Sequence, residues 1–415
     1  MRTRPMRVLA LTFLAVYASM AHQTAGHYQD FCLQWLSARL VVTGQGPQMY
    51  EREVQLAELA RHYSPEFVED NFGKKPQYGP TYPPTLGVVF APLGLLSPAQ
   101  AQWVVVEVSL VLVLVASLAL SRITDGRITW ETAVVATCTL PPFCCALALG
   151  QNTALSLAIV MIGWLCLTRE RPVLAGAVWG LFALKPTWGL AVVWIPLVIG
   201  RPRAYLGMMA SAAALVALTL PACGIEGWLG WLPIAQRTEF LYRTTPKWTE
   251  LSRDLPGIFR RFQQGFAVEC LGWAAIVAVI GITAWTWRAS GPRPTLTATG
   301  PRAVTLLAGS LLTCPRFMHY DIALAVVPLL IALADWRRLS SLSIGWLGLM
   351  AAFLWGGSAA WVMSYDGQGP QGPPLDTVAL LGLWLWGVVS ARFETAESAS
   401  EPLAPIANWI PRSAT

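Results

Sequence analysis

Asp30 is the first residue of this chain whose type and position could carry chemistry. It follows an apolar N-terminal stretch and opens a short segment in which Phe31, Trp35, Leu36 and Leu40 recur at helical spacing. A carboxylate placed where a chain leaves a bilayer is costly, which favours a functional role. Asp also caps helices, because it accepts hydrogen bonds from the first free N–H groups. Asp30 alone does not separate these two interpretations.

Further polar residues stand at the ends of apolar segments along the chain. Each has an ordinary structural interpretation: Tyr82 begins a stiff turn before a helix, and Lys185 could extend its ammonium toward the membrane interface. The topology that the arginine-containing loops predict, described below, nevertheless places all of them on the outer side of the membrane. Unrelated structural residues would be scattered over both sides. We therefore predict one polar site, made of Asp30 together with Tyr82, Gln151, Asn152, Lys185, Arg316, His319 and Asp321.

The composition predicts an all-α polytopic membrane protein in which these residues are held by transmembrane helices. The chain has 415 residues, of which 55% are hydrophobic and only 13% charged, and it contains 20 tryptophans. Apolar runs recur from end to end and alternate with short loops that contain arginine. These arginines account for much of the net charge of +6, so the basic balance indicates no nucleic-acid partner. We expect one integral membrane domain over 1–392 and a polar cytoplasmic tail over 393–415.

The arginine pattern also predicts an orientation in the membrane. Short loops that contain arginine are expected inside, and all four lysines then fall outside. About twelve spans follow, beginning with an uncleaved span over Val8–Ala21, which we prefer to a signal peptide. Residues 26–98 are expected to form an outer juxtamembrane helical segment, and 223–265 an outer loop rich in Trp and Arg. The predicted location is the cell membrane, with the site on its outer face.

The cysteines and histidines indicate no metal or cofactor site. The eight cysteines contain no Cys-x-x-Cys spacing, and the four histidines have no ligand spacing either. Cys223 and Cys314 are both expected near the outer surface, where a disulfide between them could form.

An ordered set of short motifs resembles the polyprenol-phosphate-mannose-dependent mannosyltransferases, glycosyltransferase family 87. The similarity covers most of residues 26–335, but neither the loop 223–265 nor the chain beyond 336. Each motif is weak alone, and their order and spacing make the set specific. The motifs are Asp30-Phe31 with Trp35, Ala38, Gly44 or Gly46 and Tyr50; Tyr82-Pro83-Pro84 before Phe90-Ala91-Pro92-Leu93; Gly150-Gln151-Asn152; Ala175-Gly176 before Lys185-Pro186; and Pro315 with His319-Tyr320.

The resemblance implies a glycosyltransferase-C-type fold and transfer of a hexosyl residue, expected to be mannosyl, from a polyprenyl-phosphate sugar on the outer leaflet. It implies that Asp30 is the catalytic base. The sequence leaves the acceptor open among a glycolipid, a polysaccharide and a protein, and we expect a glycolipid or polysaccharide. The leaving phosphate needs no acid, one base suffices for the acceptor hydroxyl, and cations must hold the phosphate. We expect Tyr82, Gln151, Asn152, Lys185, Arg316 and His319 to bind substrate. A single acid argues for inversion, because a retaining double displacement needs a second carboxylate.

Two other classes of protein remain open from the sequence. A transporter or lipid flippase would have charges near the bilayer midplane and an internal repeat, whereas the charges here stand at one rim. A non-catalytic scaffold of the cell envelope would leave Asp30 as a helix cap only.

Overall fold

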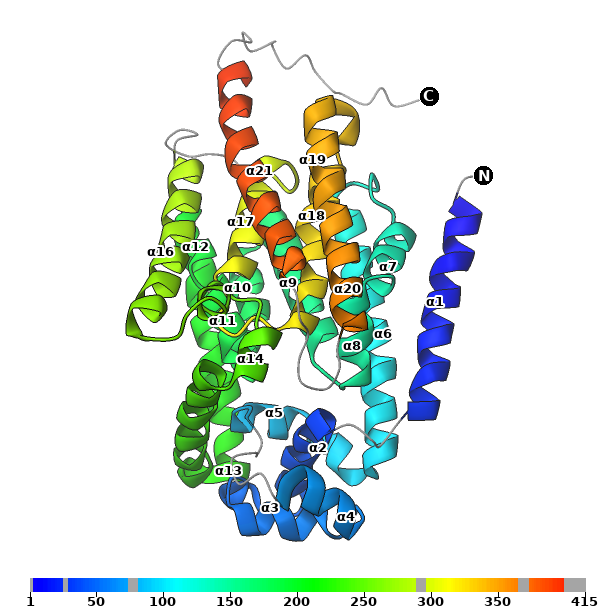
Figure 1. Ribbon diagram of the computed structural model, residues 1–415, viewed down its shortest axis with the longest axis vertical. Coiled ribbons are helices and arrows are strands. Elements are labelled where there is room, and N and C mark those ends of the chain that lie inside the picture. Colours follow the sequence, from blue (N-terminus) through cyan, green and yellow to red (C-terminus); the bar gives the residue numbers. More distant parts are fainter. Residues whose placement is uncertain (1–2, 25–28, 74–80, 289–295, 365–372, 399–415) are drawn as a thin grey trace, which may run out of the picture.

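The protein is built from helices, as the composition predicts (Figure 1). The computed structural model describes residues 3–24, 29–73, 81–288, 296–364 and 373–398. Within these ranges the only β-type pairing is one isolated bridge between Ser252 and Met318. The expectation of an all-α membrane protein is therefore confirmed.

Five helical segments in the described part of the chain are long and apolar enough to cross a membrane. They are α6 (Pro98–Ile123), α13 (Pro202–Thr244), α16 (Phe266–Arg288), the run Ser341–Met363 that joins α19 (Ser341–Ala352) to α20 (Ser358–Met363), and Leu375–Phe393 of α21 (Leu375–Ser398). A sixth would combine α7 (Trp130–Cys138) with α8 (Pro141–Ala148), which are bent by 73°. Pro141 and Pro142 explain this break, because proline lacks the N–H that a continuous helix needs.

The predicted count of about twelve spans is not supported. The other predicted spans are helical but short, and a bilayer core needs about 20 apolar residues. They are α9 (Thr153–Thr168), α10 (Pro172–Gly180) with the turn to Leu184, Pro186–Val198 with α11 (Pro186–Val192) and α12 (Ile195–Val198), α17 (Pro301–Leu312), and His319–Leu333 with α18 (Val326–Leu333). α1 (Thr3–Thr24) is also absent from the five, because Arg4, Arg7 and the polar end after Ala21 bracket a short apolar stretch.

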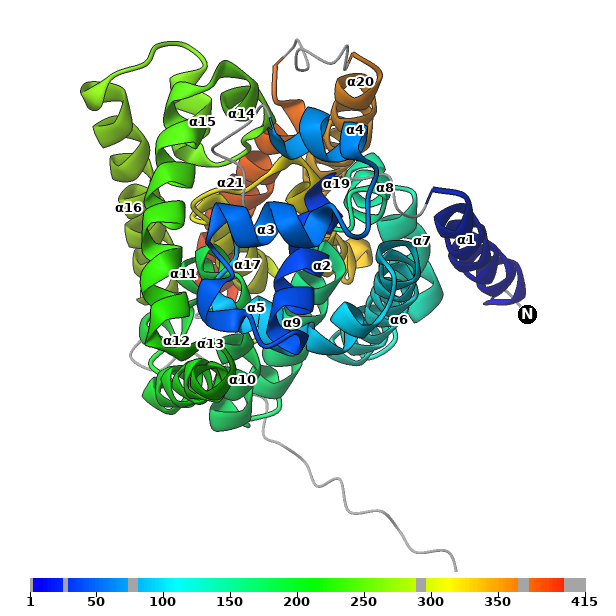
Figure 2. The ribbon, with the colours of Figure 1, turned by 90° about the horizontal axis from the view of Figure 1, so that it is seen from below.

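A layer of short helices covers one end of the bundle (Figure 2). It contains α2 (Gln29–Val42), α3 (Arg52–Leu59), α4 (Pro65–Val68) and α5 (Pro84–Val89), and it corresponds to the predicted outer segment. The apolar residues that recur at helical spacing on α2 are fully enclosed, since Phe31, Trp35, Leu36 and Leu40 are all at most 1% exposed. The protein itself encloses this helix, because α3 and α5 pack on it and Arg39 Nε donates to Glu58 Oε1 at 2.9 Å.

α13 crosses the predicted boundary between span and loop. It has a kink at Gly224, where φ is 62° and ψ is −175°, and then continues to Thr244. Gly46 from the outer layer lies against this kink, so closely that a Cβ there would stand 2.1 Å from the carbonyl oxygen of Ala222. Residues 223–265, expected as a loop, are thus mainly helical, in the second half of α13, α14 (Pro246–Leu251) and α15 (Leu255–Arg260). Cys223 and Cys314 are both free thiols, so they do not form a disulfide.

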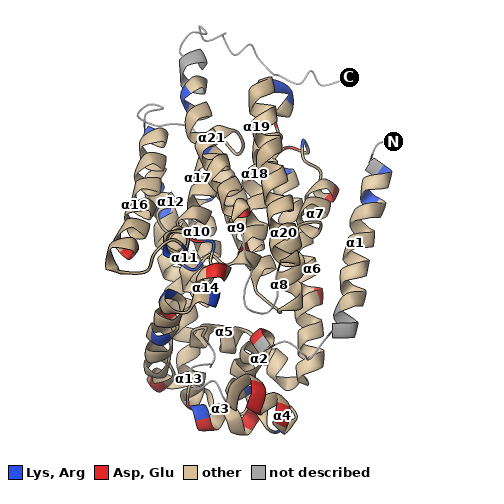
Figure 3. Cartoon of the chain, in the orientation of Figure 1, with Lys and Arg blue, Asp and Glu red and all other residues tan. Residues whose placement is uncertain are grey.

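The start of α1 and the end of α21 lie at the end of the molecule opposite the layer of short helices (Figure 1). Charged residues lie at both ends of the molecule and also around α14, between the two ends (Figure 3). α21 extends past the predicted start of the tail to Ser398, and residues 399–415 lie outside the described residues. The start of α1 and the end of α21 therefore lie at the same end of the molecule, as the arginine pattern predicts. That this end faces the cytoplasm stays a prediction.

Candidate active site

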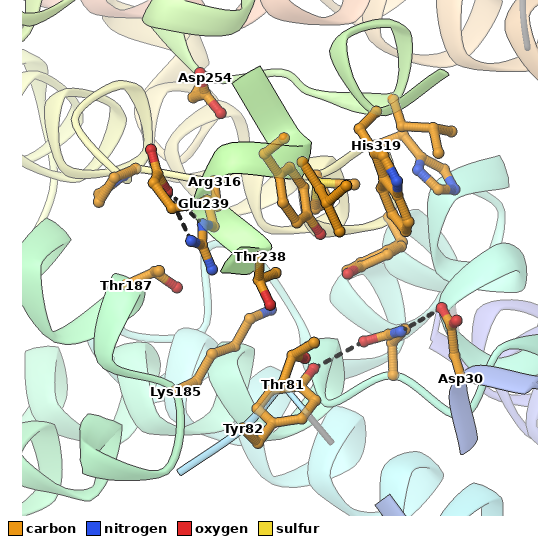
Figure 4. Close-up of a pocket in the computed structure, with 18 of the residues that line it drawn as sticks. Asp30, Thr81, Tyr82, Lys185, Thr187, Thr238, Glu239, Asp254, Arg316 and His319 are labelled. Carbon is orange, nitrogen blue, oxygen red and sulfur yellow. Dashed lines mark hydrogen bonds and ion pairs between the residues drawn. The ribbon is translucent and has the colours of Figure 1, made fainter. Parts of the chain in front are cut away.

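A cavity of about 900 Å³ has walls from the outer layer and from the helices above it. Its lining includes six of the seven predicted substrate and catalytic residues: Asp30, Tyr82, Gln151, Lys185, Arg316 and His319 (Figure 4). Asn152 is buried directly after Gln151 but does not line the cavity. Residues separated by up to 289 positions in sequence therefore meet at one site. This agrees with the prediction that they all lie on the same side of the membrane.

Asp30 is held at the cavity by uncharged groups. Gln151 Nε2 donates to Asp30 Oδ2 at 2.8 Å, and the Tyr82 hydroxyl donates to Gln151 Oε1 at 3.0 Å. The turn that presents Gln151 packs tightly on α2, because a Cβ at Gly150 would lie 2.8 Å from that of Phe31. Burial raises the pKa of the Asp30 carboxyl above its usual 3.8, and the bond from Gln151 opposes this shift only in part.

Lys185 forms an ion pair with Asp321. It stands between the turn that ends at Leu184 and α11, and its Nζ lies 2.9 and 3.1 Å from the two carboxylate oxygens of Asp321. The Asp321 side chain is fully buried, and Nζ also lies 5.5 Å from the ring centre of Tyr320. These contacts direct the ammonium into the protein, so the alternative of a lysine extended toward the interface is excluded.

Arg316 projects from a strained backbone position onto α13. Its φ is 61°, in the left-handed region that residues other than Gly rarely adopt. Its Nε and Nη2 donate to Glu239 Oε2 at 2.9 and 2.7 Å, and its guanidinium lies 5.0 Å from the ring centre of Tyr242. Such strain persists only where surrounding contacts fix it, and here they fix a cation at the cavity wall.

His319 is fixed by aromatic neighbours. Its ring centre lies 4.3 Å from that of Trp361 and 5.0 Å from that of Tyr320. The ring is 7% exposed, and its Nδ1 has no hydrogen-bond partner among the described residues. His319 can therefore offer a nitrogen to a polar ligand, although aromatic rings restrict where that nitrogen points.

The sequence interpretation missed several lining residues. Glu239 and Tyr242 were not predicted, because residues 223–265 were expected to form a loop. They lie on a helix, where a spacing of three residues places them on one face. Trp361 was assigned only to a span. Of the three tryptophans in that predicted loop, Trp231 and Trp248 line the cavity and Trp228 does not.

Comparison with known protein families gives one match. The model of glycosyltransferase family 87 matches residues 81–315, which is more than half of the chain. The chain belongs to this family. Searches of curated proteins and of solved structures found no match.

Membership of family 87 makes the protein a membrane glycosyltransferase. The matched residues contain Tyr82, Gln151, Asn152 and Lys185, whereas Asp30 and His319 lie beyond them on either side. The family match therefore supports a sugar-transfer role for the cavity as a whole. The assignment of Asp30 depends instead on its place and partners in the cavity.

Proposed function

We propose that this glycosyltransferase moves a hexosyl residue, expected to be mannosyl, from a polyprenyl-phosphate sugar to an acceptor hydroxyl. The reaction takes place at the outer face of the cell membrane and inverts the anomeric centre. The acceptor is a glycolipid or polysaccharide. Asp30 is the general base, and the cations of the cavity hold the donor phosphate.

The observation that carries this proposal is the difference among the carboxylates that line the cavity. Glu239 contacts Arg316 and Arg243, and Asp254 accepts from the N–H of Gly257 at 2.6 Å and from the Ser252 hydroxyl. Asp30 receives its hydrogen bond from a neutral amide and forms no ion pair within 4 Å in the described structure. Cations neutralise Glu239, and the Ser252 hydroxyl and the Gly257 N–H engage both oxygens of Asp254. Asp30 has a neutral amide as its partner, so it is the carboxylate suited to take a proton.

Lys185 and Arg316 are the groups we assign to the donor phosphate. Both line the same cavity as Asp30, and each is held there by an ion pair, Lys185 with Asp321 and Arg316 with Glu239. Phosphate leaves as a stable anion, so cations that stabilise its developing charge contribute more than an acid would. Tyr82 and Gln151 hold Asp30, and His319 adds a polar group to the opposite wall in Figure 4.

Transfer by the purified protein tests the donor class. We expect radiolabelled mannose to move from a polyprenyl-phosphate donor to a membrane glycan extract, and not from a nucleotide-linked mannose. A Lys185→Ala variant should need a donor concentration raised by about tenfold or more, because a charge-assisted contact is lost. Transfer from the nucleotide sugar alone would reject the proposed donor.

A further inference from the structure

Glu239 is a negatively charged residue at a site that we propose to bind phosphate, which is an unusual place for a carboxylate. It lies on the second half of α13, lines the cavity, and accepts hydrogen bonds from Arg316 at 2.7 and 2.9 Å and from Arg243 at 2.8 Å. A carboxylate among cations weakens the hold of those cations on an anion, unless it orients them or limits what they bind.

Lys185 and Arg316 are each oriented by a carboxylate and still have an unused donor. Two oxygens of the fully buried Asp321 hold Lys185 Nζ, and an ammonium has three N–H groups. Arg316 donates hydrogen bonds from Nε and Nη2 to Glu239, and its Nη1 makes no hydrogen bond within the described residues. One donor of each cation is thus available to a phosphate oxygen.

The charges of this cluster leave little room for a second phosphate. Lys185, Arg316 and Arg243 carry three positive charges, and Asp321 and Glu239 carry two negative ones. The remaining positive charge matches a sugar phosphodiester, which carries one negative charge. A diphosphate linkage carries two, and its second phosphate would meet Glu239. The nearby Arg260 is already paired with Glu269, and Lys247 acts electrostatically on Asp30.

We propose that Glu239 is a specificity-determining residue, which positions Arg316 and restricts the site to donors with a single phosphate. This inference rests on the proposed function, because it concerns the phosphate that links sugar to lipid. Like charges a few ångströms apart at a partly buried site repel each other, so the discrimination should be about tenfold or greater, which corresponds to about 1.4 kcal/mol or more.

The test compares two lipid-linked sugars that share the polyprenyl chain and mannose and differ by one phosphate. Their dissociation constants are measured for the full-length wild-type protein, for Glu239→Gln and for Glu170→Gln. Wild type should bind the monophosphate at least about tenfold more tightly. Glu239→Gln should reduce this preference by about tenfold. Glu170→Gln removes an exposed carboxylate that pairs with Arg201, and neither of these two residues lines the cavity, so this variant should keep the wild-type ratio.

Two results would overturn the inference. One is an unchanged ratio in Glu239→Gln; the other is wild-type protein that binds the diphosphate as tightly as the monophosphate, a result that needs no variant. If Glu239→Gln does not fold, Glu239→Asp decides in its place: it keeps the charge with a shorter reach, so it should preserve the ratio while weakening both ligands. Failure of the proposed function itself would look different, because wild type would then not transfer mannose from the monophosphate donor.

Discussion

Asp30 and Asp321 are both carboxylates next to the cavity, and their partners give them different roles. Asp321 is fully buried against the ammonium of Lys185, so its charge is committed to holding that cation. Asp30 has the neutral amide of Gln151 as its partner, and burial raises its pKa. One aspartate thus holds a cation, whereas the other is the base that we propose.

The pH dependence of transfer should reveal Asp30. A base must be deprotonated, so kcat/KM should fall as pH decreases through the pKa of Asp30 in the free enzyme. Because burial raises that pKa above 3.8, the acid limb should have its midpoint above 3.8. Initial rates of the purified protein over a pH series, with donor binding measured at the same pH values, would show this. A midpoint at or below 3.8 would contradict the assignment.

The sequence predicted which polar residues lie together better than it predicted the helices that hold them. Lys185 and Arg316 were predicted on the outer side from the arginine pattern, and both line the cavity with Asp30. Glu239 could not be predicted, because its helix continues through a polar stretch typical of a loop. Glu239 follows the kink in α13, and Gly46 packs against that kink in a contact between residues far apart in sequence.

A Gly46→Ala variant should test how α13 is positioned. The added methyl group would lie 2.1 Å from the Ala222 carbonyl oxygen, so either the outer layer or α13 must move. We expect a loss of about 1–3 kcal/mol in the free energy of unfolding and a higher KM for the donor, because Glu239 follows the kink. Thermal unfolding in detergent and donor kinetics would measure the two effects.

Gly281→Ala is the matched control for that variant. Gly281 lies within α16, and a Cβ there has no neighbour within 4 Å, so stability should stay the same or rise slightly. A Gly46→Ala protein as stable and as active as Gly281→Ala would show that the close approach at Ala222 does not position α13.

The whole molecule has its layer of short helices at one end and the ends of α1 and α21 at the other (Figure 1). The count of spans could not be predicted from apolar runs, since prolines such as Pro141 divide them into helices too short to cross. Our prediction of how the molecule is oriented in the membrane rests on the arginine-containing loops alone.

Cysteine labelling of intact cells tests this direction. In a Cys270→Ser background, which removes the exposed native thiol among the described residues, a cysteine replaces either Glu51 or Asp125, both of them exposed. A membrane-impermeant maleimide should label position 51 from outside and position 125 only after the cells are opened. Labelling of position 125 in intact cells would place the arginine loops outside and reverse the topology.

The central claim is that Asp30 removes the proton from the acceptor, and Asp30→Asn tests it most directly. Asn keeps the size of the side chain and most of its capping ability, but it cannot act as a base. With purified protein and a polyprenyl-phosphate sugar, we predict that the variant folds and binds donor as wild type does, while the transfer rate falls by about a hundredfold or more. Transfer at a near-normal rate by Asp30→Asn would contradict the mechanism.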